Sequence, residues 1–139
     1  MKSILSVGVG GTIGALARYY FTVPLNSNSW FPFGTFAVNM IGSFILVFFL
    51  TVILEYIQST SYLVLAVSTG FVGAFTTFSS LSVEAVKIAQ YSPVNSLLYI
   101  CSSFVFGFIL AFIGRLTGKV LIANLKRETE STEGADVCE

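Results

Sequence analysis

The chain has 139 residues, of which 55% are hydrophobic and only 10% charged, and its formal net charge is zero. These charged residues are too few to cover the surface of a water-soluble domain of this size, so the main solvent of the chain must be membrane lipid. No nucleic-acid partner is expected. Histidine is absent, which removes the usual general base near neutral pH and argues against an enzyme.

Four apolar runs follow one another along the chain, at about residues 4–23, 33–54, 62–81 and 97–122. The first three are close to the roughly 20 residues that a membrane-spanning helix needs, and the fourth is longer than one crossing requires. The first ends at Pro24 and the polar stretch 26–29, and it lacks the cleavage site of a signal peptide, so we expect it to be retained. Trp30, before the second run, has the position of an interfacial aromatic residue.

The runs predict an all-α integral membrane domain of four transmembrane helices over residues 1–125. The segment 126–139 is polar and charged, so we predict a disordered tail there. The two cysteines, Cys101 in an apolar run and Cys138 in the tail, show no metal-ligand spacing and are not expected to pair.

Four glycines open the chain, Gly8, Gly10, Gly11 and Gly14. A nucleotide-binding loop would need a preceding strand and a following βαβ unit, and neither is present. Gly10 with Gly14, and Gly11 with Ala15, instead form small-xxx-small pairs that let another helix approach closely.

Glycine and hydroxyl residues interrupt the third run, at Gly70, Gly73 and the string Thr-Thr-Phe-Ser-Ser of residues 76–80. Non-helical backbone at membrane depth is tolerated only where protein or a water-filled cavity covers it. We therefore predict a broken helix. Its opened backbone at Gly73 and Thr76 could present carbonyl oxygens, the ligands that discontinuous membrane helices give to sodium.

Three polar residues lie in or near the apolar runs. Arg18 either forms a functional or structural pair or extends its side chain to the interface. Asn39, midway through the second run, either hydrogen-bonds a neighbouring helix or lines a polar path. Glu84, near the end of the third run, is either an interfacial side chain or a charge in a vestibule.

Aromatic and hydroxyl side chains offer a second group of candidates. Phe75 and Phe78 share a face if their helix persists, which indicates packing, but the electropositive edge of a phenylalanine ring can also approach an anion. Tyr99 and Ser103 are one turn apart in the fourth run, and their hydroxyls can donate to an anion. The alternative is an interfacial Tyr99 and a Ser103 bonded to its own helix.

Three blocks of sequence resemble, in order and spacing, the helix motifs of the Fluc (CrcB-type) family of fluoride channels. They are GGTIGALARY at residues 10–19, GTFAVNMIGS at 34–43 and GFVGAFTTFSSLSVE at 70–84. With Tyr99 and Ser103, the resemblance extends from Gly10 into the fourth run.

The resemblance implies a dual-topology dimer of two antiparallel subunits, with fluoride pores between them and a structural sodium ion at their interface. Gly73 and Thr76 would bind the sodium ion through backbone carbonyls. Pore-lining roles would fall to Asn39 and Phe78, with Tyr99 and Ser103 beginning a polar track. Arg18 would match the arginine of the first motif.

Some positions depart from the family pattern. Leu81 stands where the family has a second pore phenylalanine, and Gly107 and Ala111 stand where further hydroxyls would continue the polar track. The expected function is passive export of fluoride from the cytoplasm across a bacterial inner membrane. The alternatives are a proton-coupled small-molecule exporter that uses Glu84, or a non-conducting subunit of a heterodimeric channel.

Basic residues are distributed unevenly between the two ends of the predicted spans. Lys2, Lys119, Lys126 and Arg127 share one side, with Arg115 nearby. The other side has Lys87 in a loop and the more deeply placed Arg18. The positive-inside rule then predicts cytoplasmic termini. A strongly biased subunit would pair with an inverted homologous partner in a heterodimer, and a weakly biased one would form the family's usual homodimer.

Overall fold

The computed structural model describes residues 1–26, 31–57 and 62–136, and every regular element in this part of the chain is helical. The all-α prediction is thus confirmed. The interfacial Trp30, the polar links 27–30 and 58–61, and Cys138 lie outside the described residues. The elements in chain order are α1 (Lys2–Asn26), α2 (Phe33–Val52), the π-helical η1 (Ile53–Ile57), α3 (Tyr62–Val64), the π-helical η2 (Leu65–Val72), α4 (Gly73–Phe75), α5 (Phe78–Ala89) and α6 (Pro93–Asp136).

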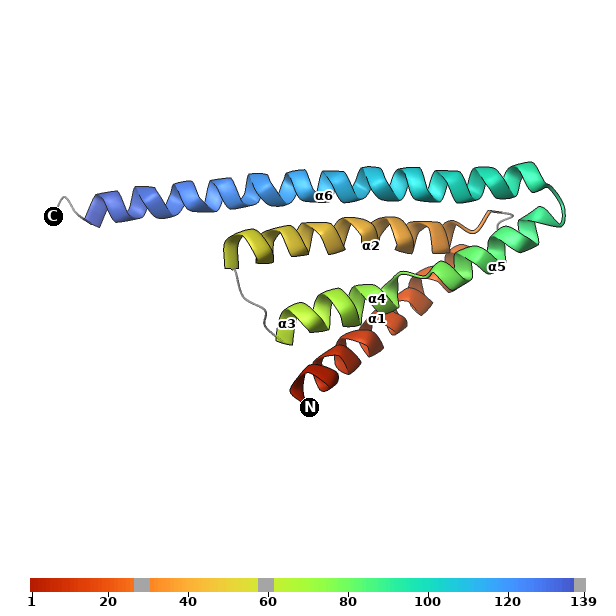
Figure 1. Cartoon of the computed structure of the whole chain (residues 1–139), viewed down its shortest axis with the longest axis horizontal. Helices are drawn as coiled ribbons and strands as arrows, with labels where there is room; N and C mark the ends of the chain where they lie inside the picture. Colours follow the sequence, from red (N-terminus) through yellow and green to blue (C-terminus); the bar gives the residue numbers. More distant parts are fainter. Residues whose placement is uncertain (27–30, 58–61, 137–139) are drawn as a thin grey trace.

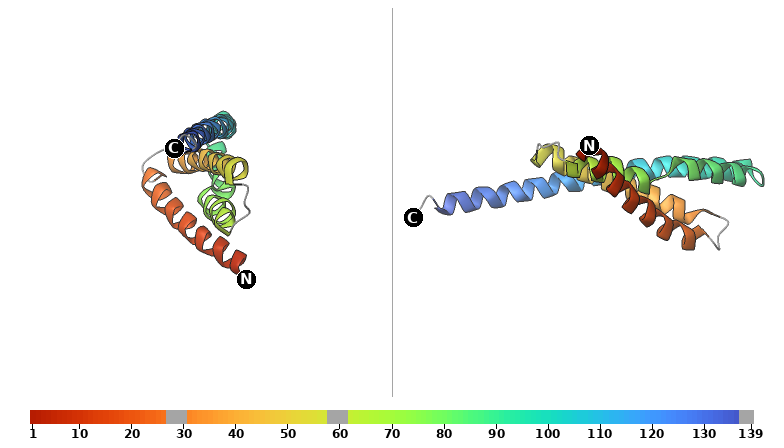
Figure 2. Two further views of the ribbon diagram at one scale, coloured as in Figure 1. Left: turned by 90° about the vertical axis from the view of Figure 1, so that its left-hand side faces the viewer. Right: turned by 90° about the horizontal axis from the view of Figure 1, so that it is seen from below.

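The helices pack as two pairs (Figure 1). α2 lies along α6, and α1 lies against η2 and α4. Seen along the long axis, α1 crosses the other helices obliquely (Figure 2, left). α5 leaves this second pair, packs on the beginning of α6 and connects to it through a tight turn. The small buried core of Leu81, Ala85 and Tyr99 lies at this junction.

Within the described residues, three helical segments are long and apolar enough to cross a membrane: Phe33–Glu55, Tyr62–Ala89 and Pro93–Glu128. They match the second, third and fourth predicted spans. α1 is helical over 25 residues, but its glycines and Arg18 lower its hydropathy and it is not among the three. A fourth span therefore stays a prediction.

Glycines bring α1 and η2 into backbone contact. A β-carbon at Gly10 would overlap the carbonyl oxygen of Ala66, and one at Gly14 would overlap that of Phe71. From the other side, a β-carbon at Gly70 would lie 2.6 Å from the carbonyl oxygen of Val7. The prediction that the small residues of the first run allow close helix approach is confirmed.

α6 is longer than the sequence predicted. Its 44 residues correspond to about 66 Å at about 1.5 Å per residue. It continues past Leu125 to Asp136, where the sequence analysis expected a disordered tail from residue 126. Because elongating an existing helix adds a hydrogen bond for each residue fixed, α6 extends readily through good helix formers such as Lys126, Arg127 and Glu128.

Candidate functional site

The third apolar run is broken where the sequence predicted. α4 ends at Phe75, and Thr76 and Thr77 are extended, with ψ of 154° and 116°. Helix resumes at Phe78, where the Thr77 hydroxyl accepts a hydrogen bond from the Ser80 amide at 3.1 Å. Threonine suits this position because its oxygen satisfies an amide that the first turn of a helix leaves unpaired. α5 then continues to Ala89, eight residues beyond the predicted end at 81.

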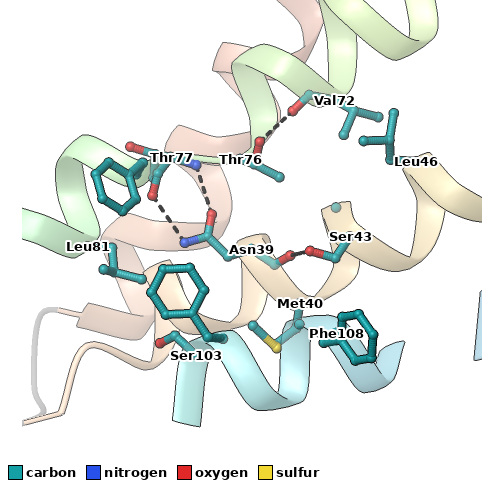
Figure 3. Close-up of a pocket in the computed structure, with 14 residues that line it drawn as sticks. Asn39, Met40, Ser43, Leu46, Val72, Thr76, Thr77, Leu81, Ser103 and Phe108 are labelled. Atoms are coloured by element: carbon teal, nitrogen blue, oxygen red, sulfur yellow. Dashed lines mark hydrogen bonds between the residues drawn. The ribbon is translucent and has the colours of Figure 1, made fainter. Parts of the chain in front are cut away.

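Asn39 holds the break in place from the neighbouring helix α2. Its Nδ2 donates to the Thr77 carbonyl at 3.1 Å, and its Oδ1 accepts from the Thr77 amide at 2.8 Å (Figure 3). A β-carbon at Gly42, one turn along α2, would overlap the Thr76 methyl group, so α2 and the break are in close contact. Of the two readings of Asn39, hydrogen bonding to a neighbouring segment is observed.

The hydrogen bonds around the break leave two backbone carbonyls without their helical partners. In a continuous α-helix, Gly73 would accept from the Thr77 amide and Thr76 from the Ser80 amide. Those amides instead donate to Asn39 Oδ1 and Thr77 Oγ1. The carbonyls of Gly73 and Thr76 are therefore available as ligands, which fits the oxygen chemistry of a sodium site in a discontinuous helix.

A cavity of about 420 Å³ opens beside the break. Asn39, Ser43 and Ser103 are its polar members from α2 and α6 (Figure 3). The Ser103 hydroxyl donates to the Tyr99 carbonyl at 2.8 Å and that of Ser43 to the Asn39 carbonyl at 2.8 Å. Each serine is thus bonded to its own helix, as the alternative reading of Ser103 predicted, and must rotate to donate to an anion. The remaining lining residues are Met40, Gly42, Leu46, Val72, Thr76, Thr77, Phe78, Leu81, Phe104, Gly107 and Phe108.

A second cavity of about 310 Å³ lies between α5 and α6, and its lining includes Ser82 and Ser96. The two cavities share Phe78, Leu81 and Phe104. Phe78 is 71% exposed and Leu81 is 7% exposed. Phe78 therefore lies with its ring accessible where the cavities meet, while Leu81 also belongs to the core.

Phe75 lies elsewhere. It is only 3% exposed, its ring stacks on that of Phe71 at 5.6 Å and meets Phe21 edge-on at 6.2 Å. It lines neither of the two cavities described here. Packing between α1 and the α4 segment is the role that the structure gives it.

Glu84 is the acceptor at the centre of a polar cluster that joins four helices. Its Oε1 accepts from Asn26 Nδ2 at 3.1 Å and Thr35 Oγ1 at 2.7 Å, and its Oε2 accepts from the Tyr99 hydroxyl at 2.9 Å. Asn26 Oδ1 in turn accepts from the Gly34 amide at 2.7 Å. We call these four side chains, Asn26, Thr35, Glu84 and Tyr99, the Glu84 cluster. Tyr99 is 1% exposed, so it is a buried donor within the fold.

Sequence reasoning missed Asn26 and Thr35. Asn26 belongs to the polar stretch at which the first run is predicted to end, although α1 includes it, and Thr35 carries no signal beyond its place in a motif. Their common partner Glu84 lies 58 and 49 residues away along the chain, a separation that no local pattern reveals. Arg18 is partly buried, and no side-chain hydrogen bond or ion pair of Arg18 is found within the described residues. Its two readings both stay open.

The chain matches a known family model over most of its length. The model described as "CrcB-like protein, Camphor Resistance (CrcB)" covers residues 5–115. A "Fluoride-specific ion channel FluC" of Thermosipho melanesiensis is 38% identical over 86% of this chain and 97% of its own. "Fluoride-specific ion channel FluC 1" of Lactobacillus johnsonii is 40% identical over 86% and 89%, respectively. A further FluC, of a Sulfurihydrogenibium strain, is 38% identical over 87% of this chain and all of its own.

Proposed function

This chain belongs to the CrcB-like protein family, and on that premise we propose that it is a subunit of a fluoride-selective channel that lets fluoride leave the cytoplasm passively. It is a multi-pass protein of the bacterial plasma membrane and an ion channel, not an enzyme. The observation that carries the proposal is the pair of neighbouring cavities beside α5 and α6, with Asn39 on the wall of the first and the exposed Phe78 on the walls of both.

The cavity walls offer fluoride weak donors in series. The first turn of α5 points its amides toward the break, and such helix ends carry partial positive charge. The exposed ring of Phe78 can add its electropositive edge. Asn39 donates one Nδ2 hydrogen to the Thr77 carbonyl, and its second Nδ2 hydrogen can be donated to a ligand. Several weak sites suit conduction because the ion must leave as well as enter.

Sodium would be held by the carbonyls of Gly73 and Thr76, where it would supply a fixed positive charge and join subunits. Gly73 supports a partner at this point. It is exposed, its φ is ordinary for a helix, and a β-carbon there would approach nothing closer than 4.0 Å within the described chain. Nothing in a single subunit requires this glycine, whereas a second subunit packed on the same face would.

The assembly that we propose is an antiparallel dimer in which α1 provides a fourth span. The 25 residues of α1 reach about 37 Å at about 1.5 Å per residue, which exceeds the roughly 30 Å of a hydrocarbon core. Its outer face exposes Leu5, Val9, Ile13 and Leu16, side chains that lipid or a partner subunit would cover.

A planar-bilayer recording tests the channel against the proton-coupled exporter. We expect a fluoride current that follows the electrochemical gradient of fluoride alone, with no chloride current and no change when a proton gradient is added. A reversal potential that shifts with the proton gradient would identify coupled transport, in which Glu84 would be the titrating group.

A further inference from the structure

We propose that Asn39 is a positioning residue for the cation site. By bonding both backbone groups of Thr77, it keeps the Gly73 and Thr76 carbonyls available to sodium. This inference rests on the sodium site of the proposed function. In this role Asn39 holds the backbone of the break, which a residue that only donates to an ion in the pore does not do.

The Thr77 amide needs a hydrogen-bond acceptor within the protein. Thr77 is 5% exposed, so its amide has little access to water. Asn39 Oδ1 fills that need at 2.8 Å. If Asn39 is removed, the acceptor of the regular helical pattern is the carbonyl four residues earlier, which is Gly73. The amide that Asn39 now satisfies would then compete with sodium for the same carbonyl.

Asn39 acts at the same time on the other side of Thr77. Its Nδ2 bond to the Thr77 carbonyl holds the peptide in its extended form, with φ of −148° and ψ of 116°. In that form the Thr77 hydroxyl caps the Ser80 amide, which is the amide that would otherwise bond Thr76. Asn39 therefore keeps both amides away from the sodium ligands. It bonds the Thr77 amide directly, and it keeps the Ser80 amide on the Thr77 hydroxyl.

The position of Asn39 also links the cation site to the cavity. Asn39 and Thr76 both line the cavity beside the break, and close contact at Gly42 allows α2 to reach it. A change at Asn39 should therefore alter sodium affinity, whereas a change at Phe78 on the same cavity should not. Phe78 is not a partner in any of the three hydrogen bonds that hold the break.

The test measures how sodium stabilises the purified, assembled full-length protein. The midpoint of thermal unfolding in detergent is followed as sodium replaces N-methyl-D-glucamine at constant ionic strength, for the parent, Asn39→Ala, Asn39→Asp and Phe78→Ile. For Asn39→Ala we expect the half-effective sodium concentration to rise about tenfold or more, the usual effect of removing a group that orients metal ligands.

Asn39→Asp and Phe78→Ile separate the effect on sodium dependence from the effect on fluoride flux. Asn39→Asp keeps an acceptor for the Thr77 amide, so its sodium dependence should change less than that of Asn39→Ala although its fluoride flux is lost. Phe78→Ile should lose flux with the sodium dependence of the parent. If Asn39→Ala does not assemble, Asn39→Ser, which is too short to reach both groups of Thr77, takes its place with the same expectation.

The inference is overturned if a folded Asn39→Ala or Asn39→Ser variant responds to sodium at the concentration that serves the parent. It is also overturned if sodium does not stabilise the parent. In that case the fluoride flux of the parent shows whether the proposed channel fails together with the cation site. A parent that conducts fluoride without responding to sodium contradicts only the cation site and its positioning by Asn39. A parent that does not conduct at saturating sodium, either alone or together with an inverted relative, contradicts the proposed channel itself.

Discussion

Two polar side chains in the apolar helices of this protein, Asn39 and Glu84, are satisfied by partners far away in the sequence, whereas hydroxyls such as those of Ser43 and Ser103 bond their own helix. Asn39 bonds the backbone of a residue 38 positions later, and Glu84 collects donors from three other helices. Such bonds are needed because a buried polar group without a partner is costly to keep in an apolar environment. Phe78 is different, since its ring is largely exposed on a cavity wall.

Replacing Phe78 with Ile should reduce fluoride flux by much more than it reduces stability. The change removes the ring edge and keeps an apolar side chain of similar bulk. Because Phe78 is 71% exposed, the free energy of unfolding should change by only about 0.5 kcal/mol. Fluoride efflux from liposomes and thermal unfolding in detergent measure the two effects.

Phe112→Ile is the matched control for that variant. Phe112 lies on α6, is 56% exposed and lines neither described cavity. It should keep the parent's flux. Equal flux in Phe78→Ile and the parent would assign Phe78 to packing.

Glu84→Gln should destabilise the fold by about 1–3 kcal/mol, the range for buried donors such as Tyr99 and Thr35 that lose an acceptor. Glutamine replaces one acceptor oxygen with an NH₂ group, which then faces a donor from Tyr99, or from Asn26 and Thr35. Thermal unfolding measures the loss, with Glu55→Gln as the control because Glu55 is exposed in η1, which follows α2. A Glu84→Gln variant as stable as the control would contradict the bonding role of the Glu84 cluster.

At the residue scale, the sequence indicated which residues are candidates for a role, but it did not indicate what those residues contact. Asn39 stood out because an amide in the middle of an apolar helix needs a partner, yet the partner, Thr77, could not be named. Asn26 and Thr35 gave no signal, since a loop asparagine and a threonine at a helix start are ordinary residues. Long-range pairing depends on how the helices pack, and a single sequence does not contain that information in a local pattern.

At the scale of the helices, local chemistry predicted more. The glycine and threonine positions of the third run gave the break, and Thr77 as a cap explains why helix resumes at Phe78. The glycines of the first run gave its close packing on η2. The ends of α5 and α6 were predicted too early, because helix continues past an apolar run wherever residues with adequate propensity follow.

Gly14→Ala should disrupt the packing of α1 on η2. The new β-carbon would overlap the Phe71 backbone carbonyl, and a backbone group cannot rotate away as a side chain can. We expect a loss of about 2 kcal/mol or more in the free energy of unfolding, typical of overpacking at a close contact. Gly8→Ala is the control, since a β-carbon there meets nothing within 4 Å, and it should be neutral or slightly stabilising because alanine favours helix over glycine.

The outcome that would contradict this account of α1 is equal stability of the two variants. That result would mean that α1 does not rest on η2 as closely as the glycines indicate. Chemical denaturation in mixed micelles, followed by the fluorescence of the single tryptophan, gives both free energies under the same conditions.

At the scale of the whole molecule, basic residues are concentrated at one end. The amino end of α1, the end of α2 and the C-terminal half of α6 lie toward the same end (Figure 1). Lys2, Arg115, Lys119, Lys126 and Arg127 belong to these segments, whereas Lys87 and Arg18, in the C-terminal half of α1, lie toward the opposite end. This distribution favours one orientation in the membrane, whereas an antiparallel dimer needs both.

We therefore predict that a tag on either terminus is accessible mainly from the cytoplasmic side, and that an inverted homologous subunit completes the channel. Leu81 fits this assembly, since a heterodimer can tolerate a weakened pore lined by a leucine in place of a phenylalanine. Accessibility of the tag to a membrane-impermeant reagent in intact and permeabilised cells measures the orientation. Equal labelling from both sides would favour the homodimer.

Fluoride efflux from liposomes tests the central claim most directly. Liposomes that contain the protein, alone or with a candidate inverted relative, are loaded with potassium fluoride or potassium chloride and diluted, and a potassium ionophore starts the flux. The account predicts rapid release of fluoride and retention of chloride in at least one of the two preparations, with loss of the release in Asn39→Asp. Retention of fluoride by every preparation that contains folded, reconstituted protein would contradict it.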